Sequence, residues 1–456
     1  MFVGIGVVVL KLSLQRVAKA VAVYREPAVL ALVFLGFSSG LPLALTASTL
    51  FVWLTEAGVD KAAIGLFAAI GTPYALKFMW APLMDRVPVP LLARLVGHRR
   101  GWILLTQMGL VAAILTMGAL KPGVDPWALG AMALVVAFLS ASQDIVIDAF
   151  RIESLEERQQ AGGAAALVFG YRVGMLVSGA GGLYLAHYSG WTTAYSVMAA
   201  LVLVGGIAVL LRPEPDAGNG NEWNAEAQEA RAEAVLAEAH VSSMLAHAAG
   251  WLYAAVIVPF AEFMSRPRWL VILLFVALYK FGDSLAGIMT NPFLIEIGFS
   301  KLDIANISKL YGFTATMIGL VVGGALMNGI GMVRSLWLCG ILQLASNFMF
   351  AVQAMVGADI GLLAVTIGFE NFAGGMGTAV FVAYLSSLCN VSYTATQYAL
   401  LSSFMAVART WLSSSSGYLA EWFGWVDFFI LTAGAAVPGL VLLWWLTRNP
   451  SLRPKT

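Results

Sequence analysis

Twelve stretches of this sequence are apolar over about 20 residues each, the length that an α-helix needs to cross a bilayer core of about 30 Å. Lipid offers the backbone no hydrogen-bond partners, so such stretches cross it as helices. Lys, Arg, Asp and Glu make up only 11% of the 456 residues, against about 25% in an average soluble domain. We therefore predict an all-α membrane protein with twelve transmembrane helices and exclude a soluble globular enzyme. The predicted spans cover about 28–50, 62–81, 102–120, 127–149, 164–186, 190–211, 269–291, 305–328, 333–356, 360–386, 397–420 and 424–447.

The formal net charge of +1 supplies no basic field for nucleic acid, so we expect no nucleic-acid partner. The two cysteines, Cys339 and Cys389, lie in separate apolar segments, and the four histidines lie in or beside predicted loops. Neither a disulfide framework nor a zinc site is therefore expected. The sequence also lacks the GxxxxGK[ST] phosphate loop. We expect a protein that uses no cofactor and no metal and is not an ATP-driven pump.

The Lys and Arg residues predicted to lie outside the membrane interior fall mostly on one side of the membrane. With the N-terminus placed inside, eighteen of them lie inside and four outside, which satisfies the positive-inside rule. We therefore predict that both termini are cytoplasmic. The chain then divides into a cytoplasmic N-terminal segment, a first six-helix bundle, a cytoplasmic linker, a second six-helix bundle and a cytoplasmic tail, at 1–27, 28–211, 212–265, 266–447 and 448–456.

The predicted linker begins as a segment rich in Pro, Gly and Asn, which is typical of flexible connections. Over 222–238, glutamates recur at spacings of four, three and four residues and form one acidic stripe on a predicted Ala-rich helix. A solvated face explains this stripe, and a docking face for a protein partner is the alternative. Residues 251–263 are too short to span a membrane and fit an interfacial helix. The sequence leaves protein partners open.

The two predicted bundles resemble each other in sequence. Residues 54–64 match 294–304 at an offset of 240, and residues 184–191 match 418–425 at an offset of 234. Because each bundle has an even number of spans, the two bundles have the same orientation in the membrane. Parallel six-helix repeats about an axis along the membrane normal are the architecture of the major facilitator superfamily.

The loop after the second predicted span also resembles this superfamily, in which the loop typically reads GxLxDRxGRR. Residues 82–86 end in an Asp-Arg pair, and residues 98–101 carry an Arg-Arg pair after an insertion of eleven residues. The resemblance implies a gate in which these arginines pair with acids and helix ends to hold the cytoplasmic side shut. Anchoring by the positive-inside rule is the alternative. The candidate gate residues are Asp85, Arg86, Arg99 and Arg100.

Five segments carry a closer resemblance: 34–47, 142–152, 278–288, 369–380 and 393–404. They resemble the AmpG-type muropeptide permeases of Gram-negative inner membranes. The resemblance implies import of N-acetylglucosaminyl-1,6-anhydro-N-acetylmuramyl peptides across the bacterial inner membrane for peptidoglycan recycling, driven by the proton gradient. It also implies an influence on inducible β-lactamase expression and thereby on antibiotic resistance.

Eight ionisable residues, four acidic and four basic, are predicted to lie at membrane depth, although a charge in hydrocarbon costs at least about 2.5 kcal/mol. They are Lys77, Asp144, Asp148, Arg172, Lys280, Asp283, Glu370 and Arg409. This balance favours a polar, partly wet cavity between the two bundles. At about 1.5 Å per residue, Asp144 lies near the midplane and Asp148 one turn away on the same helix face. We predict that both accept protons and that Arg172 tunes them; a static ion pair between the fourth and fifth helices is the alternative. The proton-coupling candidates are Asp144, Asp148, Asp283 and Glu370.

The substrate that the resemblance implies carries sugars and an acidic peptide stem. Basic side chains can receive its carboxylates, amides can hydrogen-bond its hydroxyls, and aromatic rings can lie against sugar faces. An intrahelical ion pair is the alternative for Lys280 with Asp283, and packing is the alternative for each aromatic ring. The substrate-binding candidates are Arg172, Lys280, Arg409, Gln143, Asn371, Gln397, Tyr171, Tyr279 and Trp411.

Small residues recur every four positions along the fifth predicted span, at Gly170, Gly174, Ser178 and Gly182. Such a stripe lets the backbones of two helices approach closely, so we predict a helix contact there.

Together these features predict a secondary transporter that works by alternating access, with the two bundles rocking about a site at the midplane. A transporter of the same fold for another solute, such as acetyl-coenzyme A or a sugar, is the nearest alternative. A membrane enzyme would need a nucleophile or metal constellation at the membrane surface, and the sequence offers none. A signalling protein that docks through 222–238 is a further alternative.

Overall fold

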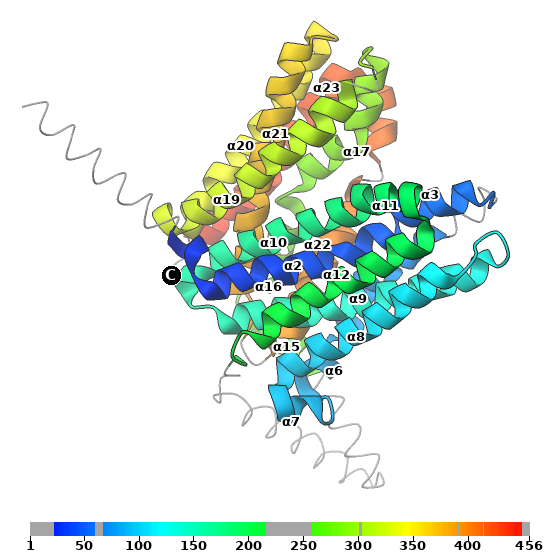
Figure 1. The fold of residues 1–456 in the computed structure, drawn as a ribbon. Helices are drawn as coiled ribbons and strands as arrows, with labels where there is room; N and C mark the ends of the chain where they lie inside the picture. The colour runs from blue at the N-terminus through cyan, green and yellow to red at the C-terminus, as the bar shows by residue number, and fades with distance from the viewer. Residues whose placement is uncertain are drawn as a thin grey trace, which may run out of the picture.

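The computed structural model describes residues 22–59, 67–215, 257–300, 303–390, 393–413 and 415–448. They form helices joined by short turns (Figure 1). The longer helices of the first part are α2 Pro27–Thr46, α3 Ser48–Glu56, α8 His98–Ala119, α9 Pro126–Ser154, α10 Gln160–Leu176, α11 Gly182–Ser189 and α12 Trp191–Leu210. Those of the second part are α15 Val258–Ser265, α16 Trp269–Leu278, α17 Phe281–Glu296, α19 Gly312–Ile330, α20 Met332–Val356, α21 Ile360–Ser387, α22 Thr394–Ser413 and α23 Ser416–Arg448.

Ten helices among the described residues are long and apolar enough to cross a membrane, and they coincide with ten of the predicted spans. The other two predicted spans are interrupted. The described part of the predicted span 62–81 begins at Phe67 and consists of 3₁₀ turns and the short helix α5 Thr72–Leu76. The helix α6 Ala81–Arg86 follows. The span predicted at 397–420 is divided between α22 and the start of α23. The predicted acidic helix 222–238 lies outside the described residues.

The predicted internal repeat is confirmed at its turns. Gly190 and Gly424 are equivalent in the repeat, and their φ angles are +82° and +71°, in the region that favours glycine. The tryptophan after each glycine packs on an aromatic ring of its own part, with ring centroids 5.2 and 5.3 Å apart. The same turn therefore precedes α12 in the first part and kinks α23 at Gly424 in the second.

The predicted helix contact along the small-residue stripe is also confirmed, between α10 and α2. A Cβ atom on Gly170 would lie 1.9 Å from the carbonyl oxygen of Val33, and one on Gly174 would lie 2.2 Å from that of Phe37. From the α2 side, a Cβ atom on Gly36 would lie 2.0 Å from the carbonyl oxygen of a residue in α10. Only glycine lets the two backbones approach each other this closely.

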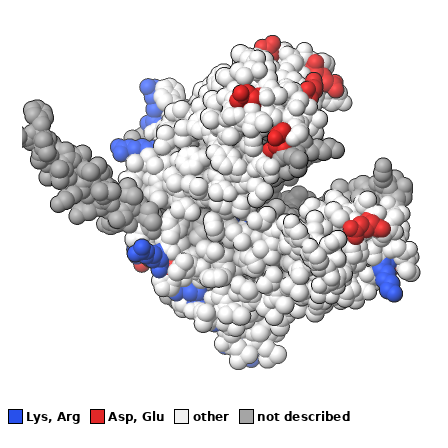
Figure 2. Space-filling model, turned by 45° about the horizontal axis from the view of Figure 1, so that its top comes forward, with Lys and Arg blue, Asp and Glu red and all other residues white. Residues whose placement is uncertain are grey.

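The helices form two groups, α2–α12 and α15–α23, which approach each other at one end and diverge toward the other (Figure 1). Between the groups, α10 lies along α19 and α21, and α22 lies along α9 and α6. The end at which the groups meet is called the closed end below. Tyr24 lies there, and its hydroxyl donates to the carbonyl oxygen of Val321 at 2.7 Å. Figure 2 shows the surface hollowed between the groups on the side away from this end.

Two helices are broken where they carry a lysine. Lys280 lies in the break between α16 and α17, with φ −109° and ψ 16°, and Lys77 begins the 3₁₀ turn Lys77–Met79. A third irregularity, the π-helical turn Val177–Gly181, follows α10. Irregular backbone at membrane depth is tolerated where it lies inside protein or lines a water-filled cavity. The breaks therefore indicate where such a cavity lies.

Candidate functional site

A cavity of about 350 Å³ lies between the two groups of helices. Its walls come from α2, α9 and α10 of the first group and from α21 and α22 of the second. Four predicted site residues line the cavity, and each keeps part of its surface exposed: Asp144, Asp148, Tyr171 and Arg172. The two carboxylates and the guanidinium thus face the space between the groups rather than acyl chains.

Asp144 lies on α9 and faces α2, where the Ser39 hydroxyl donates a hydrogen bond to its carboxylate. The ammonium group of Lys77 acts electrostatically on both Asp144 and Asp148. Lys77 is 8% exposed, so its charge depends on these acids for compensation. The break in the helix before α6 therefore supplies a cation for the two aspartates, although we predicted Arg172 in that role.

Asp148 pairs with Arg151 on the same helix, with 3.6 Å between Oδ1 and Nη2. The Arg151 side chain is completely buried and also contacts the second group, where Nη2 donates to the Ser386 hydroxyl at 2.9 Å. Its guanidinium carbon lies 5.4 Å from the centre of the Tyr398 ring. The acid at the cavity wall is thereby connected to both groups of helices.

A second set of charges lies across the interface from these aspartates. Arg172 of the first group acts electrostatically on Glu370 and Arg409, and Lys280 on Asp283 and Glu370. Lys280 Nζ donates to the Thr378 hydroxyl of α21 at 2.7 Å, away from its own helix. A network of electrostatic interactions thus links five ionisable residues: Arg172, Lys280, Asp283, Glu370 and Arg409.

Asn371 belongs to the edge of this network. Its Nδ2 donates to Glu370 Oε2 at 2.6 Å, and its Oδ1 accepts from the Thr316 hydroxyl of α19 at 2.9 Å. The amide therefore fixes the position of the Glu370 carboxylate relative to α19. It keeps part of its surface exposed.

Three other predicted ligands are buried outside the cavity lining. Gln143 Nε2 donates to the Ser38 hydroxyl at 3.2 Å, and Gln397 Nε2 donates to the Pro259 carbonyl oxygen at 3.1 Å. The Tyr279 hydroxyl donates to the Leu336 carbonyl oxygen at 2.7 Å, and its ring stacks 4.9 Å from that of Phe381. These contacts hold helices together, as the packing alternative predicts for Tyr279. The side chain of Trp411 lies outside the described part of the structure.

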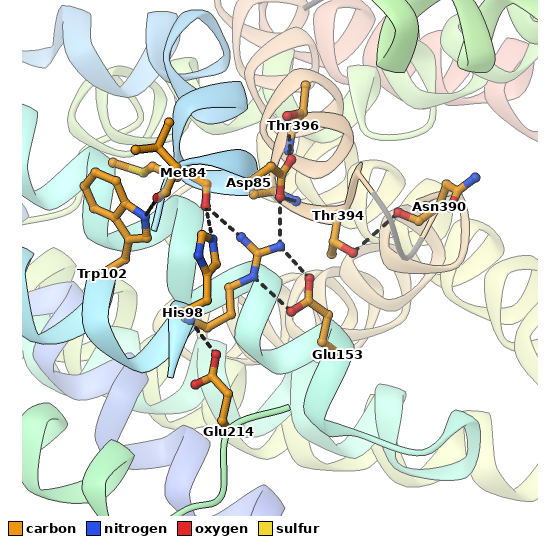
Figure 3. A network of polar contacts seen from close by, with 12 residues as sticks. Met84, Asp85, His98, Trp102, Glu153, Glu214, Asn390, Thr394 and Thr396 are labelled. Atoms are coloured by element: carbon orange, nitrogen blue, oxygen red, sulfur yellow. Dashed lines mark hydrogen bonds and ion pairs between the residues drawn. The ribbon is translucent and has the colours of Figure 1, made fainter. Parts of the chain in front are cut away.

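At the closed end, Asp85 joins the two groups directly (Figure 3). Its carboxylate accepts from the backbone N–H of Ala395 at 3.2 Å and from the N–H of Thr396 at 2.8 Å, at the start of α22. The Thr396 hydroxyl also donates to it at 2.5 Å. A carboxylate at a helix N-terminus satisfies free N–H groups and complements the helix dipole. Asp85 therefore latches α6 to α22.

Arg99 holds the Asp85 carboxylate in place. Its Nη2 lies 2.8 Å from Asp85 and 2.7 Å from Glu153 at the end of α9. All three side chains are at least nine-tenths buried. Arg100 instead donates to the Leu210 carbonyl oxygen at 3.2 Å, inside the first group. The predicted gate thus rests on Asp85 and Arg99, while Arg100 braces α8.

The Asp85→Asn variant will open the closed end more often. The amide keeps the side-chain volume but removes the charge that pairs with Arg99, and a lost buried charged hydrogen bond costs about 1–3 kcal/mol. We expect faster maleimide labelling of a cysteine at Ala149, which is 0% exposed and packs with α22. Cys339 and Cys389 are replaced by alanine for this measurement. Arg100→Gln is the control and will leave the rate unchanged; equal rates in Asp85→Asn and the parent would contradict the latch.

Sequence reasoning missed Arg151, which it placed among the loop residues, and Glu153. Both residues could have been found from the sequence, because they follow Asp144 and Asp148 on the same predicted helix. The end of a helix that carries two intramembrane acids lies close to the site. It also missed Glu214, whose carboxylate accepts hydrogen bonds from the backbone N–H groups of Arg99 and Arg100 at 2.6 and 3.1 Å. No spacing in the sequence connects Glu214 with α8.

The comparisons with known proteins agree with this architecture. Residues 32–295 match the family model described as Major Facilitator Superfamily. A protein of Escherichia coli (strain K12), named anhydromuropeptide permease, is 40% identical over 423 residues, which cover 92% of this chain and 80% of that protein. A protein of Rickettsia felis, named putative transporter AmpG 4, is 36% identical over 429 residues, 94% of this chain and 98% of its own.

Solved structures share the fold at low sequence identity. The proton:xylose symporter XylE superposes with a TM-score of 0.65 at 10% identity, over 94% of this chain and 96% of that one. The human organic anion transporter MFSD10 superposes with a TM-score of 0.61 at 15% identity, over 94% and 99%. The family model and the two related transporters, together with the ten apolar helices, show that the chain is a multi-pass membrane transporter and not an enzyme. It belongs to the major facilitator superfamily and, within it, to the AmpG-type family of anhydromuropeptide permeases.

Proposed function

We propose that this protein imports N-acetylglucosaminyl-1,6-anhydro-N-acetylmuramyl peptides across the bacterial inner membrane, together with protons, for peptidoglycan recycling. The 40% identity to the anhydromuropeptide permease of Escherichia coli, over 92% of the chain, is the observation that carries the choice of substrate. Import of this substrate would also influence inducible β-lactamase expression, as the family resemblance implies.

The charges between the two groups of helices fit such a substrate. Its peptide stem carries carboxylates, which Arg172, Lys280 and Arg409 would receive in the network described above. The Tyr171 ring at the cavity wall would lie against a sugar face. A neutral sugar would offer these cations no counter-charge, so the site favours an acidic substrate over a plain sugar.

Protons supply the energy in this proposal, and no cofactor takes part. Asp144 and Asp148 at the cavity wall would carry them, with Asp283 and Glu370 as further candidates. Each proton that moves down a potential of 100 mV provides about 2.3 kcal/mol, enough for roughly 50-fold accumulation.

The two bundles, 28–211 and 266–447, would rock about this site, with the closed end facing the cytoplasm. The distribution of charge supports this orientation. Most of the Lys and Arg visible in Figure 2 lie at the closed end, and most of the visible Asp and Glu lie at the other. Cytoplasmic faces of membrane proteins carry the excess of Lys and Arg. Both termini and the linker 212–265 would then lie in the cytoplasm.

A competition assay in proteoliposomes tests the choice of substrate. The purified protein takes up labelled anhydromuropeptide under an inward pH gradient, and unlabelled compounds are added in excess. We expect anhydromuropeptides to compete and glucose, nucleotides and acetyl-coenzyme A to leave uptake unchanged. Competition by acetyl-coenzyme A or a plain sugar as strong as that by muropeptide would favour the alternative transporter of the same fold.

A further inference from the structure

Arg151 is the buried cation between the cavity and the closed end. It lies on α9 one turn from Asp148, which lines the cavity, and two residues before Glu153, which holds Arg99. The side chain is 0% exposed and contacts Ser386 and Tyr398 of the second group. The second group can leave the first at this end only if these contacts break.

Asp148 is the carboxylate within ion-pair distance of Arg151 among the described residues. The Nε and Nη1 atoms of Arg151 have no hydrogen-bond partner in the part of the chain that the structure describes. The buried guanidinium therefore depends on Asp148 for its compensation. A buried cation that loses its only carboxylate becomes costly, and exposure to water relieves that cost.

Other ionisable groups also face this pair from the helices around it. Asp144 on α9 and Lys77 act on Asp148, and Tyr398 of α22 acts on both partners. Tyr171 of α10 faces Asp148, and Cys389, which follows α21, faces Arg151. Of these groups, Asp148 is the one that lines the cavity and pairs with Arg151.

We propose that Arg151 couples the protonation of Asp148 to the opening of the closed end. A proton that arrives from the open side neutralises the Asp148 carboxylate and leaves the buried Arg151 cation uncompensated. The contacts with Ser386 and Tyr398 then break, the closed end opens, and water reaches both residues. Asp148 releases its proton on that side, the pair forms again, and the closed end shuts. The direction in which the proton travels rests on the proposed function; the dependence of closure on charge balance does not.

This role is tested by variants that remove one charge of the Asp148–Arg151 pair and by a variant that removes both. Spin labels at Glu157 and Arg334, both exposed at the closed end, report its opening by double electron–electron resonance in nanodiscs. Cys339 and Cys389 are replaced by alanine in all variants. Asp148→Asn mimics the protonated acid and will raise the ratio of open to closed populations by about tenfold or more. Arg151→Gln will stay closed, because Gln can still donate to Ser386.

The double variant gives the decisive comparison. Asp148→Asn with Arg151→Gln removes both charges, so we expect it to return to the closed distance of the parent protein. A merely structural arginine would make the double variant at least as open as either single variant, and that result would overturn the proposal. So would an Asp148→Asn variant with the parent distances. Asp125→Asn, an exposed cap at the other end of α9, controls for effects of the amide itself.

The pH response provides a second readout. Lowering the pH will shift the parent toward the open distance, and Arg151→Gln will abolish this shift, although Asp144, Glu370 and Asp283 remain to titrate. An unchanged pH response in Arg151→Gln would contradict the proposal. If uptake in liposomes proves independent of protons, the proposed function fails, whereas the charge-balance result in nanodiscs still supports or refutes the role of Arg151.

Discussion

Liposomes that contain the Asp144→Asn, Asp148→Asn double variant will not accumulate muropeptide against its gradient, although they will still exchange it. Neutral amides keep the size and polarity of the two carboxylates at the cavity wall but cannot take up a proton. For one proton per substrate, the accumulation ratio will fall from roughly 50-fold per 100 mV to onefold. Labelled substrate inside the liposomes, measured with and without a protonophore, gives both numbers.

The matched control for this experiment lies on the same helix. Asp125 is the exposed cap of α9 and accepts from the N–H of Ala128 at 2.9 Å, a role that asparagine also performs. Asp125→Asn will therefore accumulate substrate as the parent protein does. Accumulation that persists in the double variant would remove Asp144 and Asp148 from the coupling mechanism and shift attention to Glu370 and Asp283.

The Gly170→Ala variant will yield much less folded protein than the parent sequence. Its Cβ atom would lie 1.9 Å from the carbonyl oxygen of Val33, so the backbones of α2 and α10 must separate. Overpacking in a well-packed core costs typically about 1–3 kcal/mol, and here the obstacle is backbone, which cannot turn aside. We expect a lower unfolding temperature and a smaller monodisperse peak in size-exclusion chromatography of the detergent-solubilised protein.

Gly434→Ala on α23 is the control for this change, because no atom of a neighbouring helix among the described residues lies within 4 Å of its added Cβ. Both glycines are in α-helices, so the change in helix propensity is the same in the two variants. The control will be as stable as the parent protein or slightly more stable. If Gly170→Ala behaves like Gly434→Ala, α2 and α10 do not pack as closely as the structure describes.

The sequence predicted those parts of the fold that depend on position along a helix. Hydrophobic length placed ten spans, the repeat paired residues 184–191 with 418–425, and the spacing of four predicted a close helix contact at Gly170. Each of these depends on local pattern or on one helix alone. The depth of Asp144 and Asp148 in the span follows from the rise per residue, and both line the cavity.

The direction in which a side chain points was harder to predict. Gln143, beside Asp144, points into its own bundle, and Tyr279, beside Lys280, packs on Phe381. Adjacent residues on a helix lie about 100° apart, so a neighbour of a site residue faces a different helix. The depth of a residue in the membrane was therefore predictable from the sequence, and the direction in which its side chain points was not.

The helix breaks explain the remaining differences. A hydropathy window does not detect the helix break at Lys280 or the 3₁₀ turn at Lys77, because the residues on both sides of each are apolar. Arg151 was counted as a loop cation because it lies one turn from the end of its helix. Its burial results from Ser386 and Tyr398, which are more than 230 residues away in the chain. Only the packing of the two groups reveals that contact.

The most direct test of the whole account is whether the half-depth charges lie in a crevice that water enters from one side and that substrate fills. Met175 lines the cavity on α10, and Met175→Cys is made with Cys339 and Cys389 replaced by alanine. A maleimide that does not cross membranes will label this cysteine from the periplasmic face of intact cells or oriented vesicles, and saturating anhydromuropeptide will slow the labelling. A cysteine that stays unlabelled from both faces, or that reacts at the same rate with and without muropeptide, would contradict the account.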